Sequence, residues 1–269
     1  MNNIVTADMT EVESQAFIDT ALEKTLPVLA QIAKGRRVSH LADLPIDIEK
    51  LNAAILNSTM LVFPPGMKRR NRNIVKRTYL FADVTAQIAF PDDKDRVQRW
   101  EHMLKGMKAM GWTSFSKAHI NYEETSSGLT MSNLVLDIVQ AVIGGVTGGV
   151  GVALKAGAEA ALAGLKGNKE ALSLYESNGK KGDGANFGVG SIAQDEEGDV
   201  YLALGGVSYF ASSGNTKIVF FDKTQSSGTI YQSKAAFTIY EDDYTPKKEA
   251  AADAFYEALD AAAELEFGI

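Results

Sequence analysis

The stretch "DVYLALGGVSYF", residues 199–210, decides the fold, because apolar side chains recur in it at every second position. Such alternation is typical of a β-strand that buries one face, since successive side chains of a strand point to opposite sides. We therefore expect Val200, Leu202 and Leu204 to face the core, with the residues between them on the other side. Helices over both faces of the sheet would make this alternation less informative.

The period of two continues on both sides of this stretch. Short segments rich in β-branched and aromatic residues are separated by turns that contain glycine, serine, asparagine and aspartate. The predicted strands are residues 187–193, 199–210, 216–221 and 229–240. Regularly spaced strands joined by short turns predict an antiparallel meander over residues 187–240.

Residues 1–59 are predicted to be a helical N-terminal part. Thr10 and Glu13 have the spacing of a capping box, in which each side chain bonds to the other residue's backbone at the start of a helix. Apolar residues at helical spacing follow, so we expect a helix over about residues 10–35, kinked by a proline inside it. A second, shorter helix is expected over about residues 45–56.

Residues 60–129 are predicted to be a strand–helix–strand part. Aromatic and β-branched residues indicate strands over residues 60–63 and 78–90. Apolar residues at a spacing of three and four predict a helix over residues 92–110. Alternation predicts a further strand over residues 116–123.

Two helical regions complete the predicted organisation. Residues 130–176 are glycine- and alanine-rich and are expected to form an apolar helical hairpin, followed by a loop over residues 176–186. Thr245 and the proline after it open an acidic C-terminal helix over residues 245–267. The sequence thus predicts a single α+β domain over residues 1–269. Its antiparallel sheet contains the C-terminal meander and one or two N-terminal strands, and helical layers cover it.

The composition is that of an ordinary globular protein, with 45% hydrophobic and 23% charged residues. The formal net charge is −7, and residues 240–269 alone hold nine acids and two lysines. The remainder of the chain is therefore neutral, and nucleic acid is not an expected partner. There is no cysteine, which excludes disulfides, thiolate nucleophiles and cysteine-ligated zinc.

The residue types that most often carry catalysis or bind metals are sparse. A phosphate-binding loop needs a Gly-Lys-Ser/Thr end, and no glycine-rich segment of this chain supplies one. The three histidines, His40, His102 and His119, lie far apart in the sequence and have no metal-ligand spacing. Residues 240–244, "YEDDY", lack the alternating acids and the glycine of a calcium loop. We predict no catalytic residue, metal site or cofactor.

Six cations gather within residues 68–77, "KRRNRNIVKR". They are Lys68, Arg69, Arg70, Arg72, Lys76 and Arg77. One hypothesis is contact with the phosphates of an anionic membrane surface. The alternative, which the net negative charge favours, is an exposed loop that pairs with the acidic C-terminal helix.

Residues 134–154 form an apolar window in which Asp137 is the only charge. One continuous helix of this length would be about 30 Å long, close to the thickness of the bilayer hydrocarbon. Two glycine pairs in it have the four-residue spacing that lets helices approach closely in lipid. Because glycine is costly in a helix, the alternative is a helix with a glycine bend that stays buried against the sheet. The candidate membrane-inserting residues are Leu134, Val135, Ile138, Val142, Ile143, Gly144, Gly145, Gly148, Gly149, Val150, Val152 and Leu154.

Two main hypotheses of function follow. The first is a non-enzymatic, toxin-like protein that forms pores in or perturbs membranes and stays soluble until residues 134–165 enter lipid. The second is a soluble binding or self-assembling protein without membrane activity, and an enzyme of unrecognised type is a third. Membrane lipid and self-association are the partners considered, and the sequence specifies no small-molecule ligand. The N-terminal residues lack the features of a secretory signal. We therefore expect synthesis in the cytoplasm, with release by lysis or by a dedicated secretion system.

Overall fold

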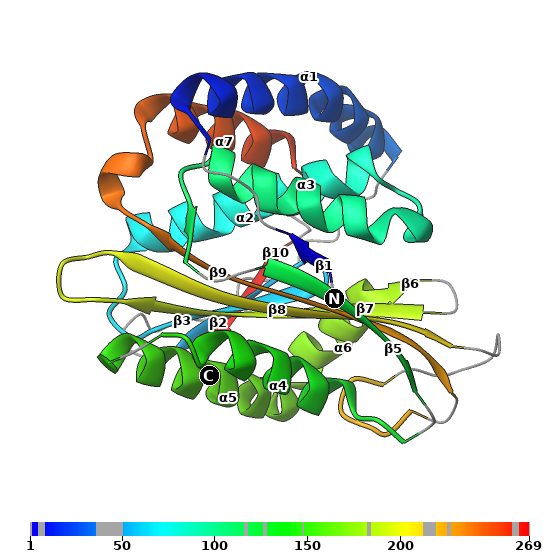
Figure 1. Cartoon of the computed structure of the whole chain (residues 1–269). Coiled ribbons are helices and arrows are strands. Elements are labelled where there is room, and N and C mark those ends of the chain that lie inside the picture. The colour runs from blue at the N-terminus through cyan, green and yellow to red at the C-terminus, as the bar shows by residue number, and fades with distance from the viewer. Residues whose placement is uncertain are drawn as a thin grey trace.

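A mostly antiparallel β-sheet lies between two layers of helices, which makes this an α+β fold (Figure 1). The computed structural model describes residues 2–4, 9–35, 51–115, 118–125, 128–146, 148–181, 184–211, 219–224, 227–259 and 264–268. Within these ranges the chain forms seven α-helices and ten strands.

The strands are β1 (Asn2–Ile4), β2 (Asn52–Leu56), β3 (Thr59–Phe63), β4 (Thr113–Ser114), β5 (Ala118–Thr125), β6 (Lys180–Lys181), β7 (Gly184–Gln194), β8 (Val200–Ala211), β9 (Gly228–Ile239) and β10 (Glu264–Gly268). Their order is β1-β5-β9-β8-β7-β3-β2-β10, while β4 pairs with β9 and β6 pairs with β7. Strands β3 and β7 are parallel, and the other pairs are antiparallel. The long strands β7, β8 and β9 form the predicted meander at the centre of the sheet.

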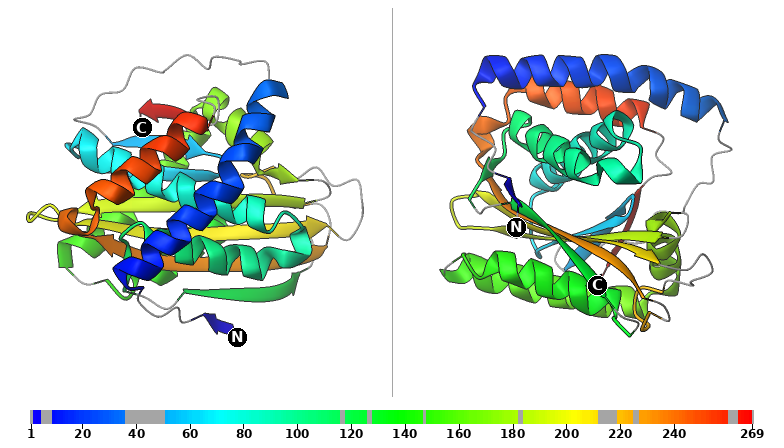
Figure 2. Two further views of the ribbon diagram at one scale, coloured as in Figure 1. Left: turned by 90° about the horizontal axis from the view of Figure 1, so that it is seen from above. Right: turned by 45° about the vertical axis from the view of Figure 1, so that its right-hand side comes forward.

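The helices cover both faces of the sheet. Helices α1 (Glu11–Gly35), α2 (Arg69–Ala89), α3 (Arg96–Ala109) and α7 (Pro246–Ala258) lie over the face called upper here, as it is drawn in Figure 1. Helices α4 (Met131–Ile143), α5 (Gly148–Gly167) and α6 (Lys169–Gly179) lie over the lower face (Figures 1 and 2). Short 3-10 helices, Asp93–Asp95 and Glu241–Asp243, precede α3 and α7.

The alternation along β8 has the predicted direction. Val200, Leu202 and Leu204 join the upper hydrophobic core, whereas Ala203 joins the lower one. Both sets are buried because helices cover both faces. The alternation therefore separates two cores from each other rather than core from solvent.

Two other predictions at the N-terminal side are confirmed. The backbone N–H of Thr10 donates to Glu13 Oε2 at 2.8 Å, and the N–H of Glu13 donates to Thr10 Oγ1 at 3.3 Å, as in a capping box. Helix α1 follows and contains Pro27. The predicted helix over residues 92–110 is also present, as a 3-10 turn followed by α3.

The prediction of a strand over residues 78–90 is wrong, because these residues belong to α2. Most residues of this helix between 78 and 89 are buried, so the segment has too few polar positions to reveal a helical period. Its two buried threonines fit a helix because each hydroxyl donates to the carbonyl four residues earlier, Thr78 to Ile74 at 2.7 Å and Thr85 to Phe81 at 2.6 Å.

The predictions of helices over residues 45–56 and 245–267 are wrong in part. Residues 45–50 lie outside the described residues, residues 52–56 are strand β2, and the C-terminal helix ends at Ala258. Strand β10 follows it and pairs antiparallel with β2. Five-residue apolar runs are too short to distinguish helix from strand by period, and this pairing joins segments about two hundred residues apart.

Residues 216–218 of the predicted strand over residues 216–221 lie outside the described residues. Residues 219–221 are irregular, and the Phe220 ring packs against Tyr175 of α6. The predicted loop over residues 176–186 is shorter than expected. Helix α6 extends into it as far as Gly179, and strand β7 begins at Gly184. The predicted strand over residues 116–123 appears as β5, shifted by two residues.

Candidate functional site

The apolar window of residues 134–154 is a helical hairpin rather than one helix. Helix α4 ends at Ile143, and α5 begins at Gly148, whose φ of +75° breaks the helical path. The glycine pairs Gly144/Gly148 and Gly145/Gly149 therefore span the turn and do not share one helix face, which corrects the close-packing interpretation. Within the described residues, no helix combines the length and the hydropathy needed to cross a bilayer.

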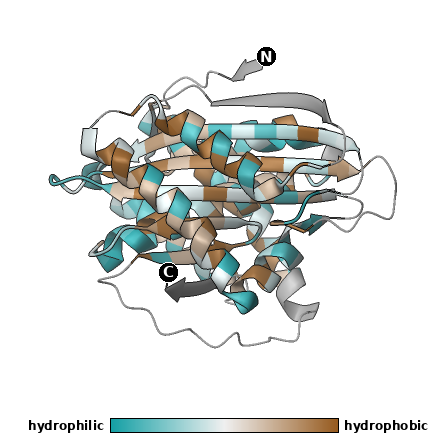
Figure 3. Ribbon diagram, turned by 90° about the horizontal axis from the view of Figure 1, so that it is seen from below, coloured by the Kyte–Doolittle hydropathy of each residue, from teal (hydrophilic) through white to brown (hydrophobic). Residues whose placement is uncertain are grey.

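The hairpin lies flat against the lower face of the sheet. Of the candidate membrane-inserting residues, Val135, Ile138, Val142, Ile143 and Leu154 are buried, Leu134 and Val150 are half-buried, and Gly144, Gly145, Gly148, Gly149 and Val152 are exposed. The buried members pack against the lower core. Figure 3 views the molecule from this side and shows hydrophobic residues mixed with hydrophilic ones along these helices.

Glycines set the distance between hairpin and sheet. A Cβ added at Gly157 of α5 would lie 2.6 Å from Ser191 Oγ on β7. A Cβ added at Gly205 of β8 would lie 2.7 Å from Val139 Cγ2 on α4. Both glycines are therefore required for the close approach of the helices to the strands.

The outer face of α5 carries few charges for a surface helix. Its exposed residues are Gly148, Gly149, Val152, Ala153, Lys155, Ala156, Glu159, Ala163, Lys166 and Gly167, of which three are charged. Val152 is 71% exposed. A helix on the surface of a globular protein normally presents a charged or polar stripe to water, and this one presents mainly small apolar side chains.

The basic run does not form one exposed patch. It lies in and just before α2, where Arg72 and Lys76 are buried. Arg70 lies 3.6 Å from Glu241 and 3.9 Å from Glu249, and Arg77 is ion-paired with Asp253 of α7. Pairing with the C-terminal acids is thus present as the alternative hypothesis expected, although the run is helical and not a loop. The remaining members, Lys68 and Arg69, are exposed.

The described residues contain no cluster of potential metal ligands. His102 is half-buried on α3, with its ring 4.9 Å from Phe17 and 5.7 Å from Phe90. Burial lowers its pKa below the ordinary value, and the nearby charges of Lys105 and Lys24 act in the same direction. His40 lies outside the described residues.

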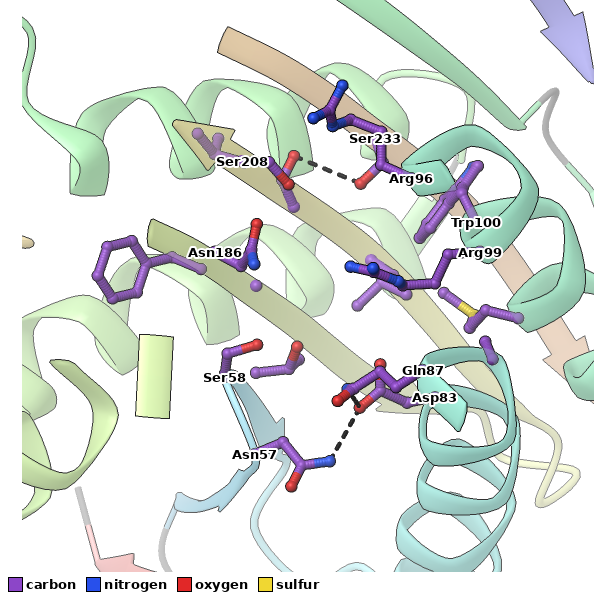
Figure 4. Close-up of a pocket in the computed structure, with 18 of the residues that line it drawn as sticks. Asn57, Ser58, Asp83, Gln87, Arg96, Arg99, Trp100, Asn186, Ser208 and Ser233 are labelled. Atoms are coloured by element: carbon purple, nitrogen blue, oxygen red, sulfur yellow. Dashed lines mark hydrogen bonds between the residues drawn. The ribbon is translucent and has the colours of Figure 1, made fainter. Parts of the chain in front are cut away.

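A cavity of about 300 Å³ lies between the upper face of the sheet and helices α2 and α3 (Figure 4). The β2–β3 turn closes one side with Asn57 and Ser58, and the end of α6 contributes Asn178. No pattern in the sequence predicted this cavity.

The floor of the cavity follows from the alternation along β8. Gly206 and Ser208 continue the face that begins with Leu202 and Leu204. In register with these two residues, β7 contributes Gly188 and Asn186, and β9 contributes Ser233 and Tyr231. Since glycine and serine replace leucine here, the sheet leaves the space between itself and the helices unfilled.

Helix α3 contributes two arginines to the cavity wall. Arg99 donates from Nε to the Phe90 carbonyl at 2.8 Å and from Nη2 to the Asp92 carbonyl at 2.9 Å. The guanidinium carbon of Arg96 lies 3.9 Å from the centre of the Tyr231 ring. Lys180, at the start of β6, is a third cation of the lining.

One carboxylate, Asp83 of α2, lies among these cations. Its Oδ2 accepts hydrogen bonds from the amides of Asn57 at 3.0 Å and Gln87 at 2.8 Å (Figure 4). Burial raises the pKa of Asp83, and the two amides and the charge of Arg99 oppose this rise only in part.

The signal that could have revealed the cavity is the change within "LALGGVS", residues 202–208. The inward positions pass from leucine to glycine and serine, which cannot fill the space beneath a helix. The polar wall could not be anticipated, because Asp83 fell in a segment predicted as a strand.

No protein-family model and no curated protein matches the sequence. A solved structure titled "DELTA-ENDOTOXIN" aligns with 77% of this chain and 89% of its own, at 13% identity and a TM-score of 0.32. Another, titled "Structure of the Evf virulence factor", aligns with 87% of this chain and 90% of its own, at 11% identity and the same TM-score of 0.32. The chain thus has a distant structural resemblance to both, at a level that carries no argument about function.

Proposed function

We propose that this chain is a non-enzymatic, membrane-active, toxin-like protein, and that the α4–α5 hairpin is the part that enters lipid. The outer face of α5 carries this proposal. Its exposed residues are mostly glycine, alanine and valine, so the helix is apolar on the sheet side and carries only three charges, those of Lys155, Glu159 and Lys166, on the solvent side. Helices that are apolar all round occur in deep cores and in membranes.

The connections of the hairpin suit such a movement. The turn at residues 144–146 joins the two helices, and Gly167 at the end of α5 has open space around its Cα. Asn168 then begins a separate helix by accepting a hydrogen bond from the N–H of Ala171 at 3.0 Å. The hairpin can therefore leave the sheet while α6 keeps its place.

The proposal can be tested by locking α5 to the sheet. A Cβ added at Gly157 would lie 3.9 Å from the Cβ of Ser191, within the range of about 3.5–4.5 Å found in disulfides. Because the chain has no cysteine, Gly157→Cys combined with Ser191→Cys offers a single possible pair within one molecule. The readout is dye release from anionic and neutral phospholipid vesicles, at neutral and mildly acidic pH.

We expect the wild type to release dye, the oxidised double variant to release none, and reduction to restore release. Gly157→Cys alone, with and without reductant, controls for the substitution and for the reductant. The proposal fails if the wild type releases no dye from any vesicle, or if the oxidised and reduced double variants release it equally.

The second candidate function is a soluble binding protein whose hairpin never moves. The interlocked contact between Gly157 and Ser191 favours it, because a helix seated this closely on a sheet is typical of a permanent core. In this case no vesicle leakage is expected from any form of the protein.

A further inference from the structure

Two buried hydrogen-bond donors without acceptors belong to residues that line the cavity. They are Arg96 Nε and Trp100 Nε1, one turn apart on α3. Leaving a buried donor unpaired is unfavourable, because it loses its hydrogen bond to water and gains none in the protein. Among the described residues, the other buried unpaired side-chain atoms lie away from the cavity, and the cavity's own two are both donors. They show that the α3 wall of the cavity is rich in hydrogen-bond donors.

The charges around the cavity also favour an acceptor-rich, negatively charged occupant. Arg96, Arg99 and Lys180 line it together with a single carboxylate, that of Asp83. The Oδ2 of this carboxylate already accepts two amide hydrogen bonds. The cavity is therefore locally positive in a chain whose net charge is −7, so its charge does not follow from the average composition.

The floor supplies groups that both donate and accept hydrogen bonds. Asn186, Ser208 and Ser233 come from three adjacent strands and face the helices across the cavity (Figure 4). Amide and hydroxyl groups of this kind pair with hydroxyl groups of a ligand. A volume of about 300 Å³ is at the lower end of the range of small-molecule pockets, which limits the occupant to a small molecule.

We propose that this cavity binds a small, hydroxyl-bearing organic anion. Its phosphate or carboxylate group lies at the α3 wall beside Arg96 and Arg99, and its hydroxyl groups meet the polar floor formed by Asn186, Ser208 and Ser233. Binding here requires no movement of the α4–α5 hairpin, because the cavity is on the opposite face of the sheet. The inference therefore stands apart from the proposed membrane activity.

Sugars that share the glucose ring but carry different charged groups provide the test. Glucose 6-phosphate, glucuronate, neutral glucose and cationic glucosamine are titrated into the full chain by isothermal calorimetry at low salt, with inorganic phosphate as a fifth probe. We expect one or both acidic sugars to bind at millimolar concentration or below and to outbind glucose, glucosamine and free phosphate. Comparison of glucose 6-phosphate with glucuronate shows whether phosphate or carboxylate is preferred.

Variants locate the site. Arg96→Gln should weaken binding of the acidic sugar about tenfold, because a charge-assisted donor is lost. Lys180→Ala should weaken it about threefold, as expected for an exposed charge. Asp83→Asn should tighten binding, since it removes the one negative charge of the lining. Lys105→Ala is the matched control, because Lys105 is an exposed cation of α3 that does not line the cavity.

The thermal midpoint of each variant without a probe shows whether it is folded. The inference is overturned if neither acidic sugar binds, if neither binds more tightly than glucose, or if Lys105→Ala weakens binding as much as Lys180→Ala does. If Arg96→Gln proves unstable, Lys180→Ala and Asp83→Asn still decide the outcome, because their expected effects have opposite signs.

Discussion

Gly157 of α5 and Ser191 of β7 fit together so closely that neither residue can change alone without cost. The Ser191 hydroxyl donates to the Leu154 carbonyl at 2.6 Å. A Cβ added at Gly157 would lie 2.6 Å from the oxygen of that hydroxyl, Ser191 Oγ. The glycine makes room for the hydroxyl, and the hydroxyl holds the helix on the strand. This contact fixes the position of the apolar hairpin on the sheet.

The pair should therefore show strong energetic coupling. Gly157→Ala overpacks the interface and should lower the free energy of unfolding by about 1–3 kcal/mol. Ser191→Ala removes a buried hydrogen bond and should cost about 1 kcal/mol. In the double variant the two Cβ atoms would lie 3.9 Å apart, an ordinary contact, so the double variant should cost less than the sum of the single ones. Denaturant unfolding of all four proteins measures the coupling, and strict additivity would contradict it.

Two adjacent glycines of the hairpin turn should respond in opposite ways to the same substitution. Gly148 has a φ of +75° and open space around its Cα, so Gly148→Ala should cost about 1–2 kcal/mol through backbone strain. Gly149 also has open space but no positive φ, so Gly149→Ala should stabilise the helix by up to about 1 kcal/mol. Thermal unfolding compares the two, and equal effects would show that the bend does not depend on the glycine conformation.

Leu104 and Trp100 lie on the same helix but in different surroundings. Leu104 is 2% exposed in the upper core, so Leu104→Ala should cost about 3 kcal/mol. Trp100 is only half-buried and lines the cavity, so Trp100→Ala should cost less despite the larger side chain. Denaturant midpoints test this order, and a larger loss for Trp100→Ala would mean that the cavity wall is a main element of the core.

The sequence predicts the central strands well because their period of two reflects local geometry. Val200, Leu202 and Leu204 do share one face, and the capping box at Thr10 and Glu13 acts within one turn. Elements decided by distant partners could not be predicted in this way. Strand β2 depends on its pairing with β10 at the other end of the chain.

The candidate sites differ in the same manner. The apolar hairpin and the bend in its glycine cluster were both visible in the sequence, because their residues are contiguous. The cavity takes its lining from α2, α3, α6, β3, β6 to β9 and the β2–β3 turn, so no single segment of the sequence reveals it. In the sequence, the floor is indicated only by the glycine and serine residues at the inward positions of β8.

His102 should make the protein less stable in mild acid. Burial lowers its pKa below the ordinary value of 6.5, so the unfolded chain takes up a proton at higher pH than the folded chain does. The free energy of unfolding should therefore fall as the pH drops through and below that value. His102→Gln removes this proton uptake and should flatten the dependence, as urea unfolding at a series of pH values can show. An unchanged slope in the variant would place the acid sensitivity elsewhere.

Asp83 should make the stability depend on pH in the opposite direction. Burial raises its pKa above the ordinary value of 3.8, so the folded chain keeps the proton to higher pH than the unfolded chain does. The folded state thus binds more protons between these two pKa values, and the free energy of unfolding should fall as the pH rises through this window. Asp83→Asn keeps an oxygen that can accept from Asn57 and Gln87 but carries no charge. At neutral pH the variant should therefore unfold at an equal or higher denaturant concentration than the wild type. Its free energy of unfolding should no longer fall as the pH rises between the two pKa values. A variant that is less stable at neutral pH would show that the ionised carboxylate, held by its two amides and Arg99, contributes more to stability than its burial costs.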